Sequence, residues 1–227
     1  MPSIGGDPRQ ARFRNRRDAG RKLAARLQGL AAQRPVIVGL PRGGIPVAAE
    51  VATALNAPLE VLAVRKIGAP HNPEYGIGAI AEDGTRVLDA EALAVLGIEG
   101  GVLESIVARE TEELRRRVAA YRGDRPLLEM RDRTVIVVDD GVATGVTDTA
   151  ALRAIRHRAP RRLILAVPVC APDSAARLRE EADEVLCLSE PPLLYGVGQW
   201  YLDFSQVSDE EVLDALGRPL RPVAGNS

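Results

Sequence analysis

Short apolar runs without regular polar alternation constrain the fold of this chain more than any other feature. They cover residues 35–40, 59–64, 134–138 and 163–169, with a shorter run at 185–188. Helical stretches separate most of them. Strands that are apolar on both faces must be covered on both faces, which is typical of a parallel sheet between layers of helices. The sequence therefore predicts an α/β fold, an open parallel sheet flanked by helices.

Composition sets the class of protein. The 227 residues are 46% hydrophobic and 27% charged, which is typical of a globular protein. The net charge is −1, so the chain has no overall positive charge that would favour nucleic acid or an anionic membrane as a partner. Cys170 and Cys187 form no CxxC pair and indicate reduced thiols. No signal-peptide core and no apolar stretch of about 18 residues is present in this sequence. We expect a cytoplasmic protein.

Residues 1–34 are predicted to form an N-terminal amphipathic helix. Apolar residues recur at helical spacing from Phe13 to Leu30, and the pattern ends before Pro35. Nine basic residues lie in this segment: Arg9, Arg12, Arg14, Arg16, Arg17, Arg21, Lys22, Arg26 and Arg34. Two interpretations are open, a nucleic-acid-binding arm and a solvated helix face or subunit contact, and we favour the second.

The segment Val135–Thr147 places acids and small residues between an apolar run and a helix. The strand delivers Asp139 and Asp140 to its carboxyl end, the edge at which open α/β sheets bind ligands. Two adjacent carboxylates there suit sugar hydroxyls or a cation. The small residues that follow leave the backbone accessible, and the helix beginning near Thr147 offers free N–H groups and its positive dipole end to a phosphate. The spacing indicates a site for a ribose 5-phosphate moiety.

At these residues the sequence resembles the motif of type I phosphoribosyltransferases that binds phosphoribosyl pyrophosphate (PRPP). The shared pattern is four apolar residues, two acids, small and apolar residues, Thr-Gly, a small residue and Thr, and it departs at Val146, which is often Gly in the family. The resemblance implies that Asp139 and Asp140 are catalytic, hold the ribose hydroxyls and contact Mg2+ through water. It implies that the 5-phosphate binds the loop Gly141, Val142, Ala143, Thr144, Gly145, Val146 and Thr147. The alternative is a pair of strand-end acids in another nucleotide- or metal-dependent fold.

Two further segments match the family by position. Pyrophosphate is implied to bind the loop after the first strand and the cations that end the second: Pro41, Arg42, Gly43, Gly44, Arg65 and Lys66. The two glycines allow close backbone approach and the cations supply charge. Without the resemblance, the first segment is an ordinary turn between strand and helix, and the second is a solvated strand end.

Two segments depart from the alternation of strand and helix. Residues 67–89 are Gly-rich and polar and predict a β-hairpin, which the resemblance identifies as the family's flexible loop over the site. The core is predicted at 35–190, and residues 191–227 form a small C-terminal hood and tail. An aromatic cluster there includes the candidate acceptor-binding residues Tyr195, Trp200 and Tyr201. Rings that stack on a base and rings that form the hood's own core are equally compatible with this pattern.

The resemblance implies a Mg2+-dependent phosphoribosyltransferase of nucleotide metabolism. It would transfer the 5-phosphoribosyl group of PRPP to a nitrogen acceptor, a nucleobase, and release pyrophosphate. The alternative is a PRPP-sensing regulatory protein with the same fold and little transferase activity. A kinase or phosphatase is disfavoured because the sequence lacks a GxxxxGKS/T loop. By analogy with the family we expect a homodimer. The acceptor base, the pathway and the strand order do not follow from the sequence.

Overall fold

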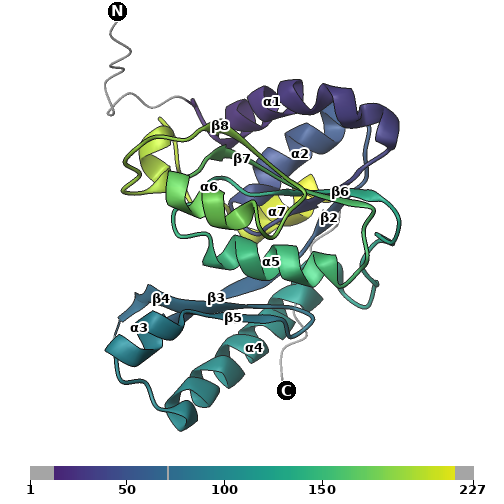
Figure 1. The fold of residues 1–227 in the computed structure, drawn as a ribbon. Coiled ribbons are helices and arrows are strands. Elements are labelled where there is room, and N and C mark those ends of the chain that lie inside the picture. The colour runs from purple at the N-terminus through teal and green to yellow at the C-terminus, as the bar shows by residue number, and fades with distance from the viewer. Residues whose placement is uncertain (1–12, 71, 218–227) are drawn as a thin grey trace, which may run out of the picture.

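The structure is a computed structural model that describes residues 13–70 and 72–217 (Figure 1). The outer parts of the predicted N-terminal helix and C-terminal tail, residues 1–12 and 218–227, lie outside this range. In chain order the elements are α1 (Arg16–Leu27), η1 (Gln28–Gln33), β1 (Val36–Gly39), α2 (Gly44–Leu55), β2 (Leu59–Val61), β3 (Val64–Ala69), β4 (Asn72–Ala81), β5 (Arg86–Leu88), α3 (Ala90–Val95), α4 (Gly100–Arg122), β6 (Thr134–Val138), α5 (Val146–Arg156), β7 (Arg162–Val169), α6 (Pro172–Leu178), β8 (Glu184–Ser189), η2 (Val197–Trp200) and α7 (Asp209–Ala215).

A five-stranded parallel sheet forms the centre of the molecule, with strand order β2-β1-β6-β7-β8. Every residue of β1 and β6 is buried. Strands enclosed in this way have no face for polar side chains, which explains their continuous apolar sequences. The predicted open parallel sheet flanked by helices is confirmed.

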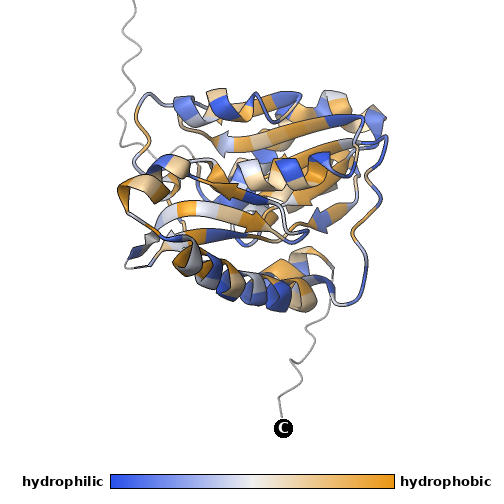
Figure 2. Cartoon of the chain, turned by 60° about the horizontal axis from the view of Figure 1, so that its bottom comes forward, coloured by the Kyte–Doolittle hydropathy of each residue, from blue (hydrophilic) through white to orange (hydrophobic). Residues whose placement is uncertain are grey.

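The elements form successive layers, which Figure 1 shows from top to bottom. Helices α1 and α2 cover one face of the parallel sheet, where their apolar side chains pack with Ile37 and Ile136. Helices α5 and α6 cover the other face. Beyond α5 lies a second, antiparallel sheet, β3-β4-β5, whose far side is covered by α3 and α4. Figure 2 shows the apolar residues concentrated on the strands between the helices.

The prediction of one strand over residues 59–64 is wrong in its extent. The apolar run 59–64 is divided between β2, which ends at Val61 in the parallel sheet, and β3, which begins at Val64 in the antiparallel sheet. Leu62 and Ala63 between them are as buried as their neighbours. An apolar run reports burial rather than strand pairing, so the sequence could not show that the chain changes sheets there.

The predicted β-hairpin is confirmed. β4 and β5 pair antiparallel around a tight turn that contains Gly84 with a φ of 89°. β3 joins them as a third strand, and the long charged helix α4 packs its apolar side, including Ile106 and Leu114, against this sheet. The described residues of 67–89 are therefore part of a packed lobe beside α5.

The N-terminal helix is shorter than predicted. α1 begins at Arg16, where the side chain of Asn15 caps it by accepting a hydrogen bond from the Asp18 N–H at 3.0 Å. It gives way to a 3-10 turn over Gln28–Gln33, and Arg34 ends that turn with a φ of 49° directly before Pro35.

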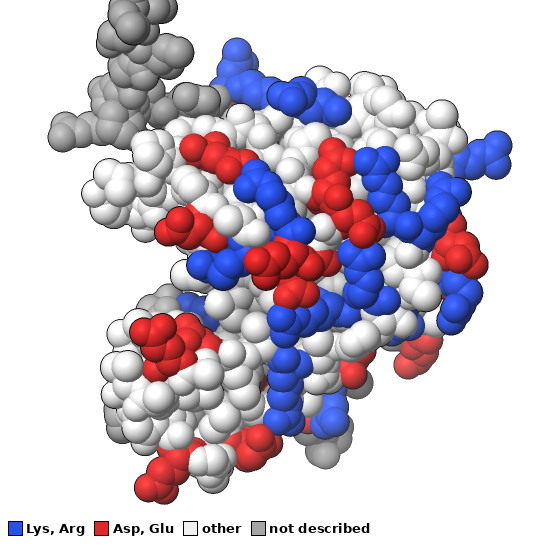
Figure 3. Space-filling model, viewed as in Figure 1, with Lys and Arg blue, Asp and Glu red and all other residues white. Residues whose placement is uncertain are grey.

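The visible surface carries charge of both signs. Figure 3 shows Lys and Arg side chains interleaved with Asp and Glu over the layer that contains α5 and α6. Ion pairs account for this mixture, among them Arg153–Glu181 and Arg156–Asp183. Such a face matches the balanced net charge. Among the described helices none is long and apolar enough to cross a membrane.

Candidate active site

The two motif acids lie where the central strand ends. Asp139 and Asp140 follow Val138, the last residue of β6. β1 runs parallel beside it, with Gly39 in register with Val138, so the loop after β1 leaves the sheet at the same edge. The structure thereby brings the predicted pyrophosphate loop next to the predicted ribose-binding acids.

Contact between this loop and the acids is very close. A Cβ added at Gly43 would lie 2.0 Å from Asp140 Oδ2, and one at Gly44 would lie 2.9 Å from Asp139 Oδ1. No side chain fits at either position without displacing an acid. The two glycines are therefore required by packing, and the peptide bond between Pro41 and Arg42 just before them is cis.

The predicted phosphate loop is held from behind by the neighbouring strand and helix. The Val142 N–H donates to the Val169 carbonyl at 2.8 Å, and the Ser174 hydroxyl donates to the Ala143 carbonyl at 2.7 Å. Gly145 caps α5 with a φ of 75°, which glycine adopts without strain. The helix that starts at Val146 leaves its first N–H groups without helical partners, as an anion site requires.

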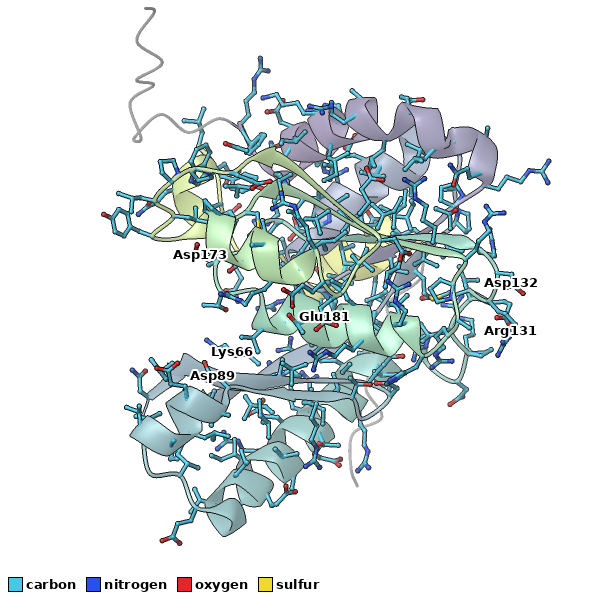
Figure 4. The ribbon with its side chains drawn as sticks, viewed as in Figure 1. Lys66, Asp89, Arg131, Asp132, Asp173 and Glu181 are labelled. Atoms are coloured by element: carbon cyan, nitrogen blue, oxygen red, sulfur yellow. The ribbon has the colours of Figure 1, made fainter. Side chains whose placement is uncertain are left out.

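A cleft of about 710 Å3 runs beside this loop. It lies between the α5–α6 layer and the lobe of β3–β5, and its walls include Thr144, Arg177 and Asp89. Figure 4 shows Asp89 and Lys66 on the lobe below the cleft, with Asp173 and Glu181 above it. The Arg177 guanidinium donates to the Thr144 carbonyl at 3.1 Å and so fixes the loop on this side as well.

The three cations predicted to contact pyrophosphate have different surroundings. Arg65 donates to Glu110 at 2.6 Å, and that carboxylate on α4 balances its charge. Arg42 is only loosely paired, with Asp209 at 3.9 Å. Lys66 is exposed on β3, its side chain passing over Gly76. Arg42 is consequently better placed than Arg65 to meet an anionic group.

The hood aromatics divide into buried and exposed rings. Trp200 and Tyr201 are 8% and 5% exposed and pack with Phe13 from the N-terminal segment, whereas Tyr195 is 80% exposed. The Tyr201 hydroxyl donates to the Asp140 carbonyl at 2.6 Å. This arrangement favours the interpretation that Trp200 and Tyr201 are core residues of the hood. Of the three predicted acceptor-binding residues, Tyr195 alone presents an open ring.

A cation that the motif did not reveal also reaches the site. Arg16, at the start of α1, pairs with Asp140 through its Nε at 2.7 Å. The basic N-terminal segment was expected to be a solvated face or a contact surface, and Arg17 and Arg21 fit that description because their side chains are more than half exposed. Arg16 differs from both, with a side chain that is 12% exposed.

A third acid beside the site, the buried Asp148, was not predicted. It lies in the first turn of α5 and its Oδ1 is buried without a hydrogen-bond partner among the described residues. The sequence does contain a signal, because Asp148 shares the helical spacing of Ala151, Leu152 and Ile155, all of which are buried. An acid on the apolar stripe of a helix should have been treated as a buried acid.

The electrostatics of the three acids follow from their burial. Burial raises the pKa of Asp139 well above its usual range, and the nearby charges of Asp140 and Asp148 raise it further. Burial also raises the pKa of Asp140, although Arg16 opposes that shift. The pKa of Asp148 rises to about 7 for the same reason, desolvation. Folding therefore disfavours the charged forms of all three acids.

These features, a parallel α/β sheet with two acids and a loop bounded by Gly141 and Gly145 at one edge, define a class of α/β proteins whose candidate ligand site lies at the carboxyl ends of the strands. Comparison with known families assigns the class: residues 12–203 match the phosphoribosyl transferase domain, and the chain belongs to that family. The type I resemblance and its fold are thus confirmed.

Individual relatives agree with this assignment. Over 212 residues the chain is 44% identical to Rv0571c and MT0597, proteins of two Mycobacterium tuberculosis strains that are named provisionally as phosphoribosyl transferases. The match covers 93% of this chain and 48% of theirs, so the chain spans about half the length of these relatives. Among solved structures, the chain is similar to TT1426 from Thermus thermophilus, with 46% sequence identity. The crystal structure of TT1426 superposes with a TM-score of 0.75, and the match covers 90% of this chain and 97% of that one.

Proposed function

We propose that the protein is a phosphoribosyltransferase that moves the 5-phosphoribosyl group of PRPP to a ring nitrogen of a nucleobase and releases pyrophosphate. The observation that carries the proposal is the meeting of Asp139, Asp140, the 141–147 loop and the Gly43–Gly44 loop at one edge of the sheet. PRPP carries the three matching groups, because its ribose, with the hydroxyls at positions 2 and 3, joins a phosphate at position 5 to a pyrophosphate at position 1.

The chemistry assigns a task to each part. The acceptor nitrogen attacks C1 of the ribose, the C1–oxygen bond breaks with its electron pair leaving on pyrophosphate, and the acceptor loses a proton. C1 gains cationic character in the transition state, which the carboxylates of Asp139 and Asp140 stabilise while they hold the ribose hydroxyls. Residues 141–147 anchor the 5-phosphate, so that remote binding energy is used to orient C1. Arg42 and Lys66 meet the departing pyrophosphate.

Mg2+ is the metal that the family implies. The described residues form no group of three or more metal-binding side chains, so they do not make a protein cage for a metal. Two adjacent carboxylates do fit the usual habit of Mg2+, which binds one or two protein carboxylates, several waters and the phosphates of a substrate. Asp139 and Asp140 would contact it through water, and when bound it neutralises the charge of the leaving pyrophosphate.

The acceptor is proposed at the hood. Tyr195 offers an 80% exposed ring, so a flat base has aromatic surface there. Trp200 and Tyr201 then shape the hood from within. The cytoplasmic location, the homodimer and the absence of a nucleic-acid partner remain predictions.

The test is a calorimetric titration of PRPP with Mg2+, followed by a screen of nucleobases for pyrophosphate release. Binding followed by release with one base supports the transferase. Binding with no release from any base supports the PRPP-sensing alternative, and no binding contradicts both. Ribose 5-phosphate serves as the control ligand, since it lacks pyrophosphate and gives no turnover.

Substituting Gly43 by Ala is expected to weaken PRPP binding by about tenfold or more. The added Cβ would lie 2.0 Å from Asp140 Oδ2 and must push that carboxylate aside. The φ of Gly43 is −62°, which alanine adopts freely, so thermal unfolding should shift by only a few degrees. Gly29→Ala is the matched control, because nothing lies within 4 Å of its added Cβ. Equal PRPP affinities in Gly43→Ala and wild type would show that Asp140 is not held where PRPP binds.

A further inference from the structure

Arg16 connects three parts of the molecule that are distant in sequence. Its Nε donates to Asp140 Oδ2 at 2.7 Å, and its Nη1 donates to the Ser205 carbonyl at 2.7 Å. Its guanidinium carbon lies 3.8 Å from the centroid of the Phe204 ring. The side chain is thereby fixed on an edge by two charge-assisted hydrogen bonds and on a face by an aromatic ring.

The backbone places Arg16 with the same precision. The Phe13 N–H donates to the Trp200 carbonyl at 3.0 Å, and the Leu202 N–H donates to the Phe13 carbonyl at 2.9 Å. Phe13 therefore joins the hood through a single β-bridge to Tyr201 shortly before α1 begins, and Figure 1 shows the start of α1 beside the segment that follows β8. Arg16 lies three residues after Phe13, so this bridge holds the start of α1 beside the site.

The space around Asp140 explains why such a contact matters. Gly43 packs against the Oδ2 side of the Asp140 carboxylate and leaves no free space there. A Cβ added at Gly43 would lie 3.2 Å from Arg16 Nε as well as against Oδ2. The Tyr201 hydroxyl holds the backbone carbonyl of the same residue. Asp140 is thus fixed at Oδ2 and at its main chain, which leaves Oδ1 as the oxygen that a ribose hydroxyl can reach.

We infer that Arg16 is a positioning residue for the ribose of PRPP, acting through Asp140 from outside the sequence motif. This inference rests on the proposed function. Arg16 fixes the rotamer of Asp140 before the ligand arrives, so that the hydroxyl meets a carboxylate already aimed at it. It also makes the N-terminal segment and the hood parts of the ribose site. Arg17 and Arg21 on the same helix pair loosely with Glu50 at 3.6 and 3.5 Å and have no such role.

A double-mutant cycle with Arg16→Gln and Asp140→Asn tests the inference. We expect Arg16→Gln to weaken PRPP binding by about tenfold, and the double mutant to bind no more weakly than Asp140→Asn alone, because Arg16 acts only through that carboxylate. Ribose 5-phosphate, measured as a competitor of PRPP, should lose affinity in parallel. Inorganic pyrophosphate without Mg2+, which has neither ribose nor a metal to engage Asp140, should bind Arg16→Gln and wild type equally.

Controls separate a positioning role from a structural one. Arg16→Lys keeps the charge but loses the planar fork, so it should restore part of the PRPP affinity, and it replaces Arg16→Gln in the cycle if that variant does not fold. Arg17→Gln should behave as wild type. Additive losses in the cycle, or an equal loss of pyrophosphate affinity, would overturn the inference while leaving the proposed function intact. Failure of the wild-type protein to bind PRPP would overturn both.

Discussion

Asp139→Asn and Asp140→Asn should each lower PRPP affinity by about 100-fold or more, yet they should change stability in different directions. Each carboxylate accepts a charge-assisted hydrogen bond from a ribose hydroxyl in the proposed complex, and the neutral amide cannot replace its charge. Asp139 has a pKa raised well above its usual range by burial, so at neutral pH its ionised form destabilises the folded state. Asp139→Asn removes that penalty and should unfold at a higher temperature than wild type.

Asp140→Asn should not share this gain in stability. Burial raises the pKa of Asp140 too, but the carboxylate is the partner of Arg16, whose side chain is largely buried. Removing one member of such a pair leaves the other charge uncompensated. We therefore expect an unfolding temperature at or below that of wild type for Asp140→Asn.

Calorimetry with PRPP and Mg2+ and a thermal melt at neutral pH give both readouts. Asp132→Asn is the matched control, because Asp132 is exposed, precedes β6 at the opposite edge of the sheet and has a φ of 58°, which Asn adopts readily. Wild-type PRPP affinity in either motif variant would contradict the proposed role of that acid. A large loss of stability in Asp139→Asn would show that the carboxylate is structural.

The edge of the sheet could be predicted because its parts are local in sequence. An apolar run, an acidic pair, small residues and a helix start lie in order within 135–148, and parallel strands necessarily present such turns at one edge. The loop at Gly43 and Gly44 follows another strand of the same sheet, so its approach to the acids follows once β1 and β6 are neighbours. The strand order could not be predicted from the sequence, because it depends on which strands pair. The break between β2 and β3 could not be predicted for the same reason.

Arg16 could not be predicted because its partner lies 124 residues away. Its segment contains nine basic residues that look alike in the sequence, and only the pairing of Phe13 with the hood selects one of them for the site. The same contact determines whether the aromatic rings of the hood are buried or open to a ligand. Spacing predicts that Trp200 and Tyr201 belong to the hood, but whether a ring stacks on a ligand or packs against Phe13 depends on the N-terminal segment.

Asp148→Asn is expected to stabilise the protein, by up to about 4 kcal/mol at about pH 8. The pKa of Asp148 rises from 3.8 to about 7 on folding, because burial disfavours the carboxylate. Above pH 7 the folded protein bears the full penalty of the buried charge. As the pH falls, the folded state takes up a proton while the unfolded chain stays ionised, so the penalty shrinks and disappears below the unfolded pKa. At about pH 5 the stability difference should be less than half of that at about pH 8.

Urea denaturation of wild type and Asp148→Asn at the two pH values measures this difference. Asp173→Asn is the control, since Asp173 also lies in the first turn of a helix but is exposed, so its substitution should cost only the small interaction with the helix dipole. A variant less stable than wild type at both pH values would show that Asp148 Oδ1 has a partner in solution. A second outcome is that Asp148→Asn gains stability but binds PRPP less tightly. That result would show that the protein keeps the buried carboxylate of Asp148 for its effect on Asp139, although this carboxylate lowers the stability of the fold.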